Sequence, residues 1–201
     1  MDRAYCKECI ASSGGCCISV FDDGWKIVLL PSEIKRISLV TRKEPTEFVD
    51  VSPLAPVQRD WYASRYAIED PLWTRLFSLW SRPCGIKSFC PFLSEEGCHL
   101  SYEAKPFLCR IYPLGFNITT GHICHAQETD CPAGKAGKTI EEVIAYFDDN
   151  KASLERGFQG FRQEVLYWLN VLEGLHAAKQ HQLMPDNTDL PDQEVKSKGG
   201  L

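Results

Sequence analysis

The cysteines are the residues of this sequence whose type and spacing most clearly indicate chemistry. All ten lie within the first 131 residues, and four of them form a C-x2-C-x6-C-C pattern near the N-terminus: Cys6, Cys9, Cys16 and Cys17. A two-residue spacer lets both sulfurs of a pair reach one metal ion from a tight turn. Gly14-Gly15 gives the backbone the freedom to bend the later pair toward that ion. Adjacent side chains point in different directions, so we expect Cys16 and Cys17 to differ: one binds while the other packs, or each serves a separate centre.

A second group of cysteines follows, separated by spacers of 7, 10, 14 and 6 residues: Cys90, Cys98, Cys109, Cys124 and Cys131. Pro106 lies inside the spacer before Cys109, so a helical segment must break or begin there. Arg110 can neutralise thiolate charge or donate a hydrogen bond to a nearby carbonyl. The nine cysteines of the two groups are therefore candidate metal ligands. Cys84 lies outside both groups and is expected to be a packed thiol.

Two other uses of the cysteines fit the sequence less well. A disulfide framework needs an oxidising compartment, whereas the N-terminal stretch MDRAYCKE is charged and lacks the apolar segment of a secretory signal. Scattered buried thiols would explain Cys84, but not the Cys6-Lys-Glu-Cys9 step followed by an adjacent pair. We therefore favour thiolate ligation of a metal, in a cytoplasmic protein.

The ligand type limits the choice of metal. All-thiolate sites suit zinc or an iron–sulfur cluster, because hard ions prefer carboxylates. The Cys-Pro steps at positions 90 and 131 are similar to a step in some ferredoxin motifs. Three histidines could replace a thiol, although each is more often a surface or core residue: His99, His122 and His125. The expected cofactor is an iron–sulfur cluster or Zn2+, in one or two centres.

The composition bounds the class of protein. With 201 residues, 44% of them hydrophobic and 11% aromatic, the chain can form one well-cored domain, with or without an appendage. Its net charge of −5 is not the basic balance that nucleic-acid binding requires. The longest apolar run, around Ile27–Leu30, is far too short to cross a bilayer. We expect a monomer without a nucleic-acid or membrane partner; the sequence does not identify its protein or small-molecule partner.

Local signals predict the elements that position the cysteines. Trp25–Leu30 is an apolar, β-branched run typical of a short strand, and a helix is expected to begin at Ser32. Prolines make 43–57 a predicted loop. Helical spacing resumes from Val57, and Asp70-Pro71 favours a further helix with Asp70 as its N-cap.

Aromatic residues and a turn motif mark the middle of the chain. The aromatic cluster of 57–82 is expected to pack in a core rather than to form a binding cage. Gly115–His125 predicts a β-hairpin, with its turn at Thr119–Gly121. The hairpin would deliver Cys124 to the metal centre.

The last third of the chain is predicted to be helical. Thr139 and Glu142 form a capping box at the start of one helix. A second helix carries a narrow apolar seam with steps of 4, 3, 4, 3, 4 and 3 residues: Leu154, Phe158, Phe161, Val165, Trp168, Leu172 and Leu175. Two glycines weaken the seam, so packing back on the domain is favoured over dimerisation.

These elements predict a fold that is mainly α with a small β-hairpin, a metal-stapled α+β single domain. Residues 1–138 would form the cysteine-cluster metal-binding domain, and 139–184 a C-terminal helical segment packed on it. Residues 185–201 are predicted to be a disordered tail, because they are polar and rich in proline and glycine.

Several motifs together are similar to the YkgJ family of cysteine-cluster proteins, which is described as a zinc- or iron-chelating domain. The matching segments cover about 6–138: the N-terminal cysteines, Pro31-Ser32-Glu33-Ile34-Lys35-Arg36-Ile37, Cys90-Pro91-Phe92-Leu93, Cys98 through Pro113, and Cys131-Pro132-Ala133-Gly134. The chain departs from the family in the six-residue spacer before Cys16 and in Lys105, where an arginine is usual. The resemblance implies a bound metal and leaves the activity open.

Three functions are compatible with such a metal. The first is a metal-binding protein whose biochemical activity is not readable from the sequence. The second is a metal-dependent protein-modifying enzyme, because some relatives carry this domain in a flagellin lysine-N-methylase, with the 57–82 segment lining a pocket. The third is an interaction module in which metal staples the fold and the C-terminal helix docks a partner. A nucleotide-binding P-loop at Gly137-Lys138-Thr139 is disfavoured, because Pro132 occupies the position of its first glycine.

Overall fold

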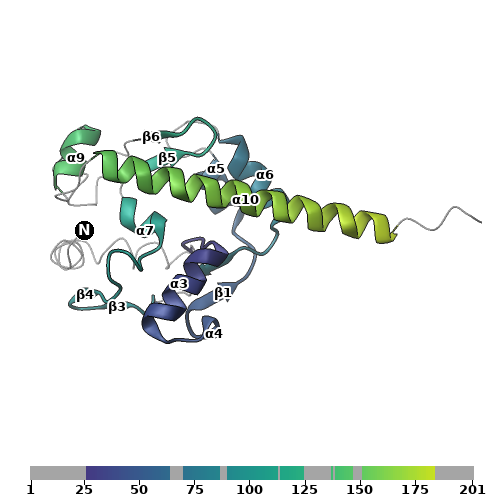
Figure 1. Cartoon of the computed structure of the whole chain (residues 1–201), viewed down its shortest axis with the longest axis horizontal. Coiled ribbons are helices and arrows are strands. Elements are labelled where there is room, and N and C mark those ends of the chain that lie inside the picture. The colour runs from purple at the N-terminus through teal and green to yellow at the C-terminus, as the bar shows by residue number, and fades with distance from the viewer. Residues whose placement is uncertain are drawn as a thin grey trace, which may run out of the picture.

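The computed structural model describes residues 26–63, 70–86, 90–112, 114–124, 137, 139–146 and 151–183, and helices predominate among them (Figure 1). The helices are α3 (Pro31–Thr41), α4 (Pro45–Phe48), α5 (Pro56–Ala63), α6 (Pro71–Leu79), α7 (Phe107–Ile111), α9 (Ile140–Tyr146) and α10 (Lys151–Leu183). The strands are β1 (Val49–Val51), β2 (Cys84–Ile86), β3 (Leu93–Ser94), β4 (Gly97–Cys98), β5 (Gly115–Asn117) and β6 (His122–Cys124). They pair as three small antiparallel sheets, β1–β2, β3–β4 and β5–β6. The predicted fold class, mainly α with a small β-hairpin, is confirmed.

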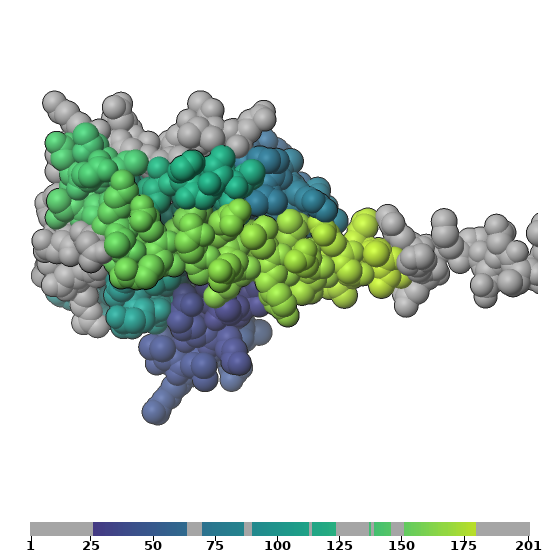
Figure 2. Space-filling view, turned by 45° about the horizontal axis from the view of Figure 1, so that its top comes forward, coloured from purple at the N-terminus to yellow at the C-terminus, as the bar shows by residue number. Residues whose placement is uncertain are grey.

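The 33-residue helix α10 runs across the body, in contact with α6 and α7, and its C-terminal turns project beyond the body (Figures 1 and 2). The predicted seam is buried in its first part, where Val165 is fully enclosed, and Leu169 joins it. Trp168 and Leu172 are partly buried, whereas Leu175 is 54% exposed. The seam prediction is therefore wrong at Leu175, because the helix projects beyond the body there and the described residues do not cover it.

Most of the core is one apolar cluster, here called the main core cluster, which joins α5, α6, α7, the β5–β6 hairpin and α10. The rings of Trp73 and Phe77 stack at 5.2 Å between centroids, and the Tyr62 ring lies 5.0 Å from that of Trp73. The prediction that the aromatic residues of 57–82 pack in a core is confirmed for Tyr62, Trp73 and Trp80, which are buried, and Trp61 is partly buried against the same cluster. Tyr66 lies outside the described residues.

A smaller cluster, here called the second core cluster, lies beside α3 and α4. Its buried members are Leu29, Ile37, Phe48, Ile86, Phe92, Leu100 and Ala104. The Phe48 and Phe92 rings meet at 5.4 Å between centroids. This cluster joins the segment before α3 to the segment that carries the second group of cysteines.

The predicted loop over 43–57 is wrong, because the structure has α4, β1 and the start of α5 there. Pro45 and Pro56 are the first residues of α4 and α5, positions where a missing N–H costs nothing and the fixed φ favours a helix. Glu47 supports α4 by accepting a hydrogen bond of 2.7 Å from the N–H of Glu44. The prolines therefore start helices here instead of breaking them.

Residues 26–30 run beside β2, but they form one isolated bridge there instead of the predicted strand. Val28 forms an antiparallel bridge with Gly85, and the N–H of Leu29 donates to the carbonyl of Cys84 at 2.9 Å. Trp25, with which the predicted strand began, lies outside the described residues. The pairing places this segment, which follows the N-terminal cysteines, next to Cys84.

Asp70 precedes α6 as predicted, but its side chain does not cap that helix. The buried carboxylate instead accepts hydrogen bonds from the N–H of Ile118 and from the hydroxyl of Thr119, the latter at 2.7 Å. Arg162 of α10 donates to the carbonyl of Ile118 at 2.6 Å. The hairpin turn is thereby fixed to both α6 and α10.

Two local predictions in the second half are confirmed. The hairpin has its strands at β5 and β6, with Phe116 opposite Ile123. The capping box is present, because the N–H of Thr139 donates to Glu142 Oε2 at 3.0 Å and the N–H of Glu142 donates to Thr139 Oγ1 at 3.2 Å. These bonds show that Thr139 caps the start of α9.

Candidate metal centre

Three cysteines of the second group, Cys90, Cys98 and Cys109, are half-buried and pack against the second core cluster. The carbonyl of Cys90 accepts a hydrogen bond of 3.0 Å from the N–H of Leu93, and Leu93 pairs with Cys98 across β3–β4. A tight turn follows Cys90, and a short hairpin contains Cys98; both cysteines pack against this cluster.

Cys109 reaches the same cluster from α7. That helix begins directly after Pro106, as the sequence predicted, and the N–H of Arg110 donates to the carbonyl of Pro106 at 3.0 Å. The buried rings and side chains of Phe107, Leu108 and Ile111 anchor the helix in the main core cluster. Cys109 therefore lies on a short, well-anchored helix at the boundary between the two clusters.

Glu33 connects α3 to α7, a role that sequence reasoning missed. Its carboxyl group is 1% exposed and accepts two backbone hydrogen bonds, from the N–H of Phe107 at 2.7 Å and from the N–H of Leu30 at 2.9 Å. Burial raises the pKa of Glu33, and the two backbone donors and Arg36 oppose that shift. Because Leu30 and Phe107 are next to the starts of α3 and α7, one carboxyl group joins the two helix N-termini. The sequence signal for this link was that Glu33 and Phe107 both lie in segments that resemble the YkgJ motifs.

Two arginines gather around this joint. Arg36 Nη2 donates to the carbonyl of Lys105 at 3.3 Å and lies 3.7 Å from the carboxyl group of Glu33. The guanidinium of Arg110 lies 5.5 Å from the ring centres of both Tyr102 and Phe107. Burial and the charge of Arg36 lower the pKa of Arg110. In the described part of the chain, the buried Nε atoms of both arginines have no hydrogen-bond partner.

Arg110 follows Cys109 directly in the chain, so a positively charged residue adjoins this cysteine. The guanidinium of Arg36 lies 3.7 Å from the carboxyl group of Glu33, and its charge also contributes to the lowered pKa of Arg110. Thiolate ligands carry negative charge, and nearby cations favour the thiolate over the thiol. Thiolates are the donors that zinc and iron–sulfur clusters take.

The remaining candidates are less defined. Cys124 is the last residue of β6; Cys6, Cys9, Cys16, Cys17 and Cys131 lie outside the described residues. Within those residues, no three histidine, cysteine, aspartate or glutamate side chains come together as a metal-binding group. Cys90, Cys98 and Cys109 hence share a cluster without forming a closed site of their own.

Cys84 lies apart from these cysteines. Its half-buried thiol packs against the main core cluster, whereas the other three pack against the second. Burial raises the pKa of the Cys84 thiol, and the charge of Lys26 partly offsets this rise. Packing of this thiol in a core agrees with its expected role.

The histidines differ in placement. His99 and His122 are exposed, and His125 lies outside the described residues.

No helix of the described residues has the length and hydropathy needed to span a membrane. Comparison with protein-family models, with curated proteins and with solved structures finds no match to this chain.

Proposed function

We propose that this protein binds an iron–sulfur cluster or Zn2+ through cysteines from both groups. The supporting observation is that Cys90, Cys98 and Cys109 all pack against one apolar cluster, and that Arg110 follows Cys109 directly. Cys90 and Cys109 are 19 positions apart in the chain, so folding, and not closeness in the sequence, brings both to this cluster.

The ligands would come from Cys90, Cys98, Cys109, Cys124 and Cys131 together with the N-terminal group. Because the described cysteines form no closed site, thiols from the N-terminal segment are needed to complete it. Residues 26–30 and α3 come after that segment in the chain, and Leu29 and Ile37 belong to the second core cluster, against which Cys90 and Cys98 also pack. A bound metal would supply either electron transfer, as an iron–sulfur cluster, or a structural crosslink, as zinc.

Purification under anaerobic conditions tests the proposal directly. Metal analysis and the visible spectrum of the full chain should show iron and sulfide with broad absorption, or zinc and a colourless protein. Cys109→Ser should lose metal, whereas the matched change Cys84→Ser should keep it. Wild-type protein that carries neither metal, even after anaerobic reconstitution with iron and sulfide or with zinc, would contradict the proposal.

We also propose that the protein acts as a monomer in the cytoplasm. A reducing compartment keeps thiols available to a metal, and the buried part of α10 packs within its own chain. Light scattering of the metal-loaded protein tests the oligomeric state.

A further inference from the structure

Two arginines at the joint between α3 and α7 carry buried hydrogen-bond donors that the described residues leave unpaired. The Nε atoms of Arg36 and Arg110 are enclosed, and neither has a hydrogen-bond partner among those residues. A buried donor without an acceptor is destabilising, and more so when it belongs to a charged group. Because nearly all buried donors in folded proteins are paired, these two need an acceptor.

Arg110 is held in place by aromatic rings. Its guanidinium lies 5.5 Å from the ring centres of both Tyr102 and Phe107. It forms no side-chain hydrogen bond or ion pair with the part of the chain that the structure describes. The rings fix the position of the charge, and its N–H groups stay available to an acceptor.

Arg36 reaches the same region from α3. Its Nη2 atom donates to the carbonyl of Lys105 at 3.3 Å and lies 3.7 Å from Glu33 Oε1, the oxygen that accepts the N–H of Phe107. Both guanidinium groups therefore lie beside the start of α7. Burial and the charge of Arg36 lower the pKa of Arg110, and two cations this close favour an anion next to them.

Neither Glu33 nor the solvent supplies that anion. The two carboxyl oxygens of Glu33 accept the backbone N–H groups of Phe107 and Leu30, and the 3.7 Å to Arg36 is longer than a hydrogen bond. The Nε atoms are enclosed, so an ion in the solvent does not reach them. The acceptor must therefore be held inside the protein.

We propose that Arg110 and Arg36 donate their Nε–H groups to metal-bound thiolates of the centre proposed above, on which this inference rests. Cys109 directly precedes Arg110, and the contacts of both guanidinium groups lie in the segment that joins Cys98 to Cys109. Hydrogen bonds and positive charge around the ligands stabilise thiolates and strengthen metal binding. Both arginines are positioning residues, since a guanidinium stays protonated and is no metal ligand.

Metal retention by the full chain, purified anaerobically, tests this proposal. In competition with a chelator at pH 7, Arg110→Gln should hold metal about ten- to a hundredfold less tightly, the loss that follows removal of a partner of the ligands. It should also release the metal at a higher pH, because its thiolates take up protons more readily. Arg36→Gln should shift both in the same direction.

The conservative variant separates charge from hydrogen bonding. Arg110→Lys keeps the positive charge but has no Nε–H group, so its metal affinity should lie between those of the wild type and Arg110→Gln. If the metal is an iron–sulfur cluster, its reduction potential should fall in Arg110→Gln, because hydrogen bonds to sulfur and net charge set that potential.

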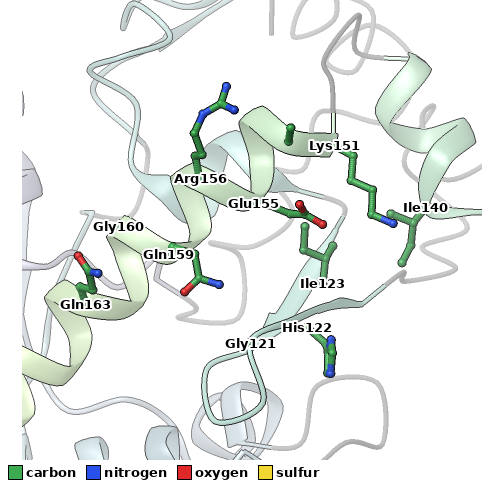
Figure 3. Close-up of a pocket in the computed structure, with 11 residues that line it drawn as sticks. Gly121, His122, Ile123, Ile140, Lys151, Glu155, Arg156, Gln159, Gly160 and Gln163 are labelled. Atoms are coloured by element: carbon green, nitrogen blue, oxygen red, sulfur yellow. The ribbon is translucent and has the colours of Figure 1, made fainter.

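Two variants serve as controls. A cavity of about 780 Å³ between the β5–β6 hairpin and α10 is lined on α10 by residues that include Glu155 and Arg156, and by no cysteine among the described residues (Figure 3). Figure 3 shows Arg156 pointing away from the hairpin, so Arg156→Gln removes an arginine charge outside the joint and should retain metal as the wild type does. Leu169→Ala opens a hole in the main core cluster, so it should lower thermal stability without changing the pH of metal release.

The outcomes separate this inference from the proposed function. Wild-type protein that holds no metal after reconstitution would contradict both. Wild-type protein that holds metal, with Arg110→Gln and Arg36→Gln indistinguishable from Arg156→Gln, would overturn this inference alone. So would a shift in Leu169→Ala as large as that in Arg110→Gln, because a general loss of stability would then explain both.

Discussion

The carboxyl group of Glu33 accepts a hydrogen bond of 2.7 Å from the backbone N–H of Phe107, 74 residues later in the chain. The same group accepts the N–H of Leu30 at 2.9 Å. It therefore fixes the helix that carries Cys109 to the helix that follows the N-terminal cysteines. If both groups of cysteines hold a metal, as we propose, Glu33 would help to position them without being a ligand itself.

Glu33 should make stability depend on pH. Its pKa in the folded protein is raised above the ordinary value of 4.5, with burial as the main cause. The folded state therefore holds the proton more tightly than the unfolded chain does. The resulting stabilisation is fully present below pH 4.5 and is lost as the pH rises through the folded-state pKa. The free energy of unfolding of the wild type, relative to Glu33→Gln, should thus decrease from pH 4 toward neutral pH.

Urea unfolding of both proteins at several pH values, at equal metal content, measures this difference. If the free energy of unfolding of the wild type, relative to Glu33→Gln, increases with pH, the fold favours the ionised carboxylate instead. Glu33→Ala should be less stable than either at every pH, because two buried N–H groups lose their acceptor at about 1–3 kcal/mol each.

Loss of a metal ligand should cost folding as well as metal. A metal that joins distant segments of the chain adds its binding free energy to the folded state. Cys98→Ser and Cys109→Ser should therefore lower metal content and thermal stability together, while Cys84→Ser leaves metal content unchanged. Metal analysis and thermal melts of the three variants decide this; retention of full metal by Cys109→Ser would refute its assignment as a ligand.

Local chemistry made part of this fold predictable. The helix after Pro31, the hairpin around Thr119–Gly121 and the Thr139–Glu142 capping box all follow from residues a few positions apart. The short helix at Pro106 was predicted for the same reason.

Contacts between distant segments were not predictable. Asp70 stands where a helix N-cap is expected, directly before Pro71. Its carboxylate instead accepts hydrogen bonds from Ile118 and Thr119, because the hairpin turn packs there and its buried N–H needs an acceptor. The joint made by Glu33 and the cavity beside Glu155 likewise depend on which segments the core brings together. Sequence spacing already separated Cys84 from the candidate ligands, and the fold agrees, because Cys84 packs against the main core cluster whereas Cys90 and Cys98 pack against the second.

Gly85 should be intolerant of a side chain. A Cβ there would lie 2.6 Å from Cδ and 2.8 Å from Cγ of Lys26. Lys26 cannot move aside, because its buried ammonium group donates to the carbonyl of Pro83 at 2.8 Å and to Ser52 Oγ at 3.1 Å. Gly85→Ala should therefore destabilise the protein by about 1–3 kcal/mol, as overpacking does. Gly174→Ala is the matched control, since a Cβ there meets nothing within 4 Å.

Thermal or urea unfolding of the two alanine variants checks this pair. Gly174→Ala should be neutral or more stable by up to about 1 kcal/mol, because alanine lowers the entropy of the unfolded chain and favours helix. Equal effects at Gly85 and Gly174 would contradict the close packing of Lys26 over β2.

Two positions of the α10 seam should respond differently to the same change. Val165 is fully buried, so Val165→Asp places a charge in the main core cluster and should cost several kcal/mol, on the order of 3–5, or prevent folding. Leu175 is 54% exposed on the projecting part of the helix, so Leu175→Asp should change stability by about 0.5 kcal/mol or less. The seam taken from the sequence alone would predict similar losses. Urea unfolding measures both, and light scattering of Leu175→Asp adds a second test: a wild-type dimer that this variant abolishes would show that the projecting helix pairs with a second chain.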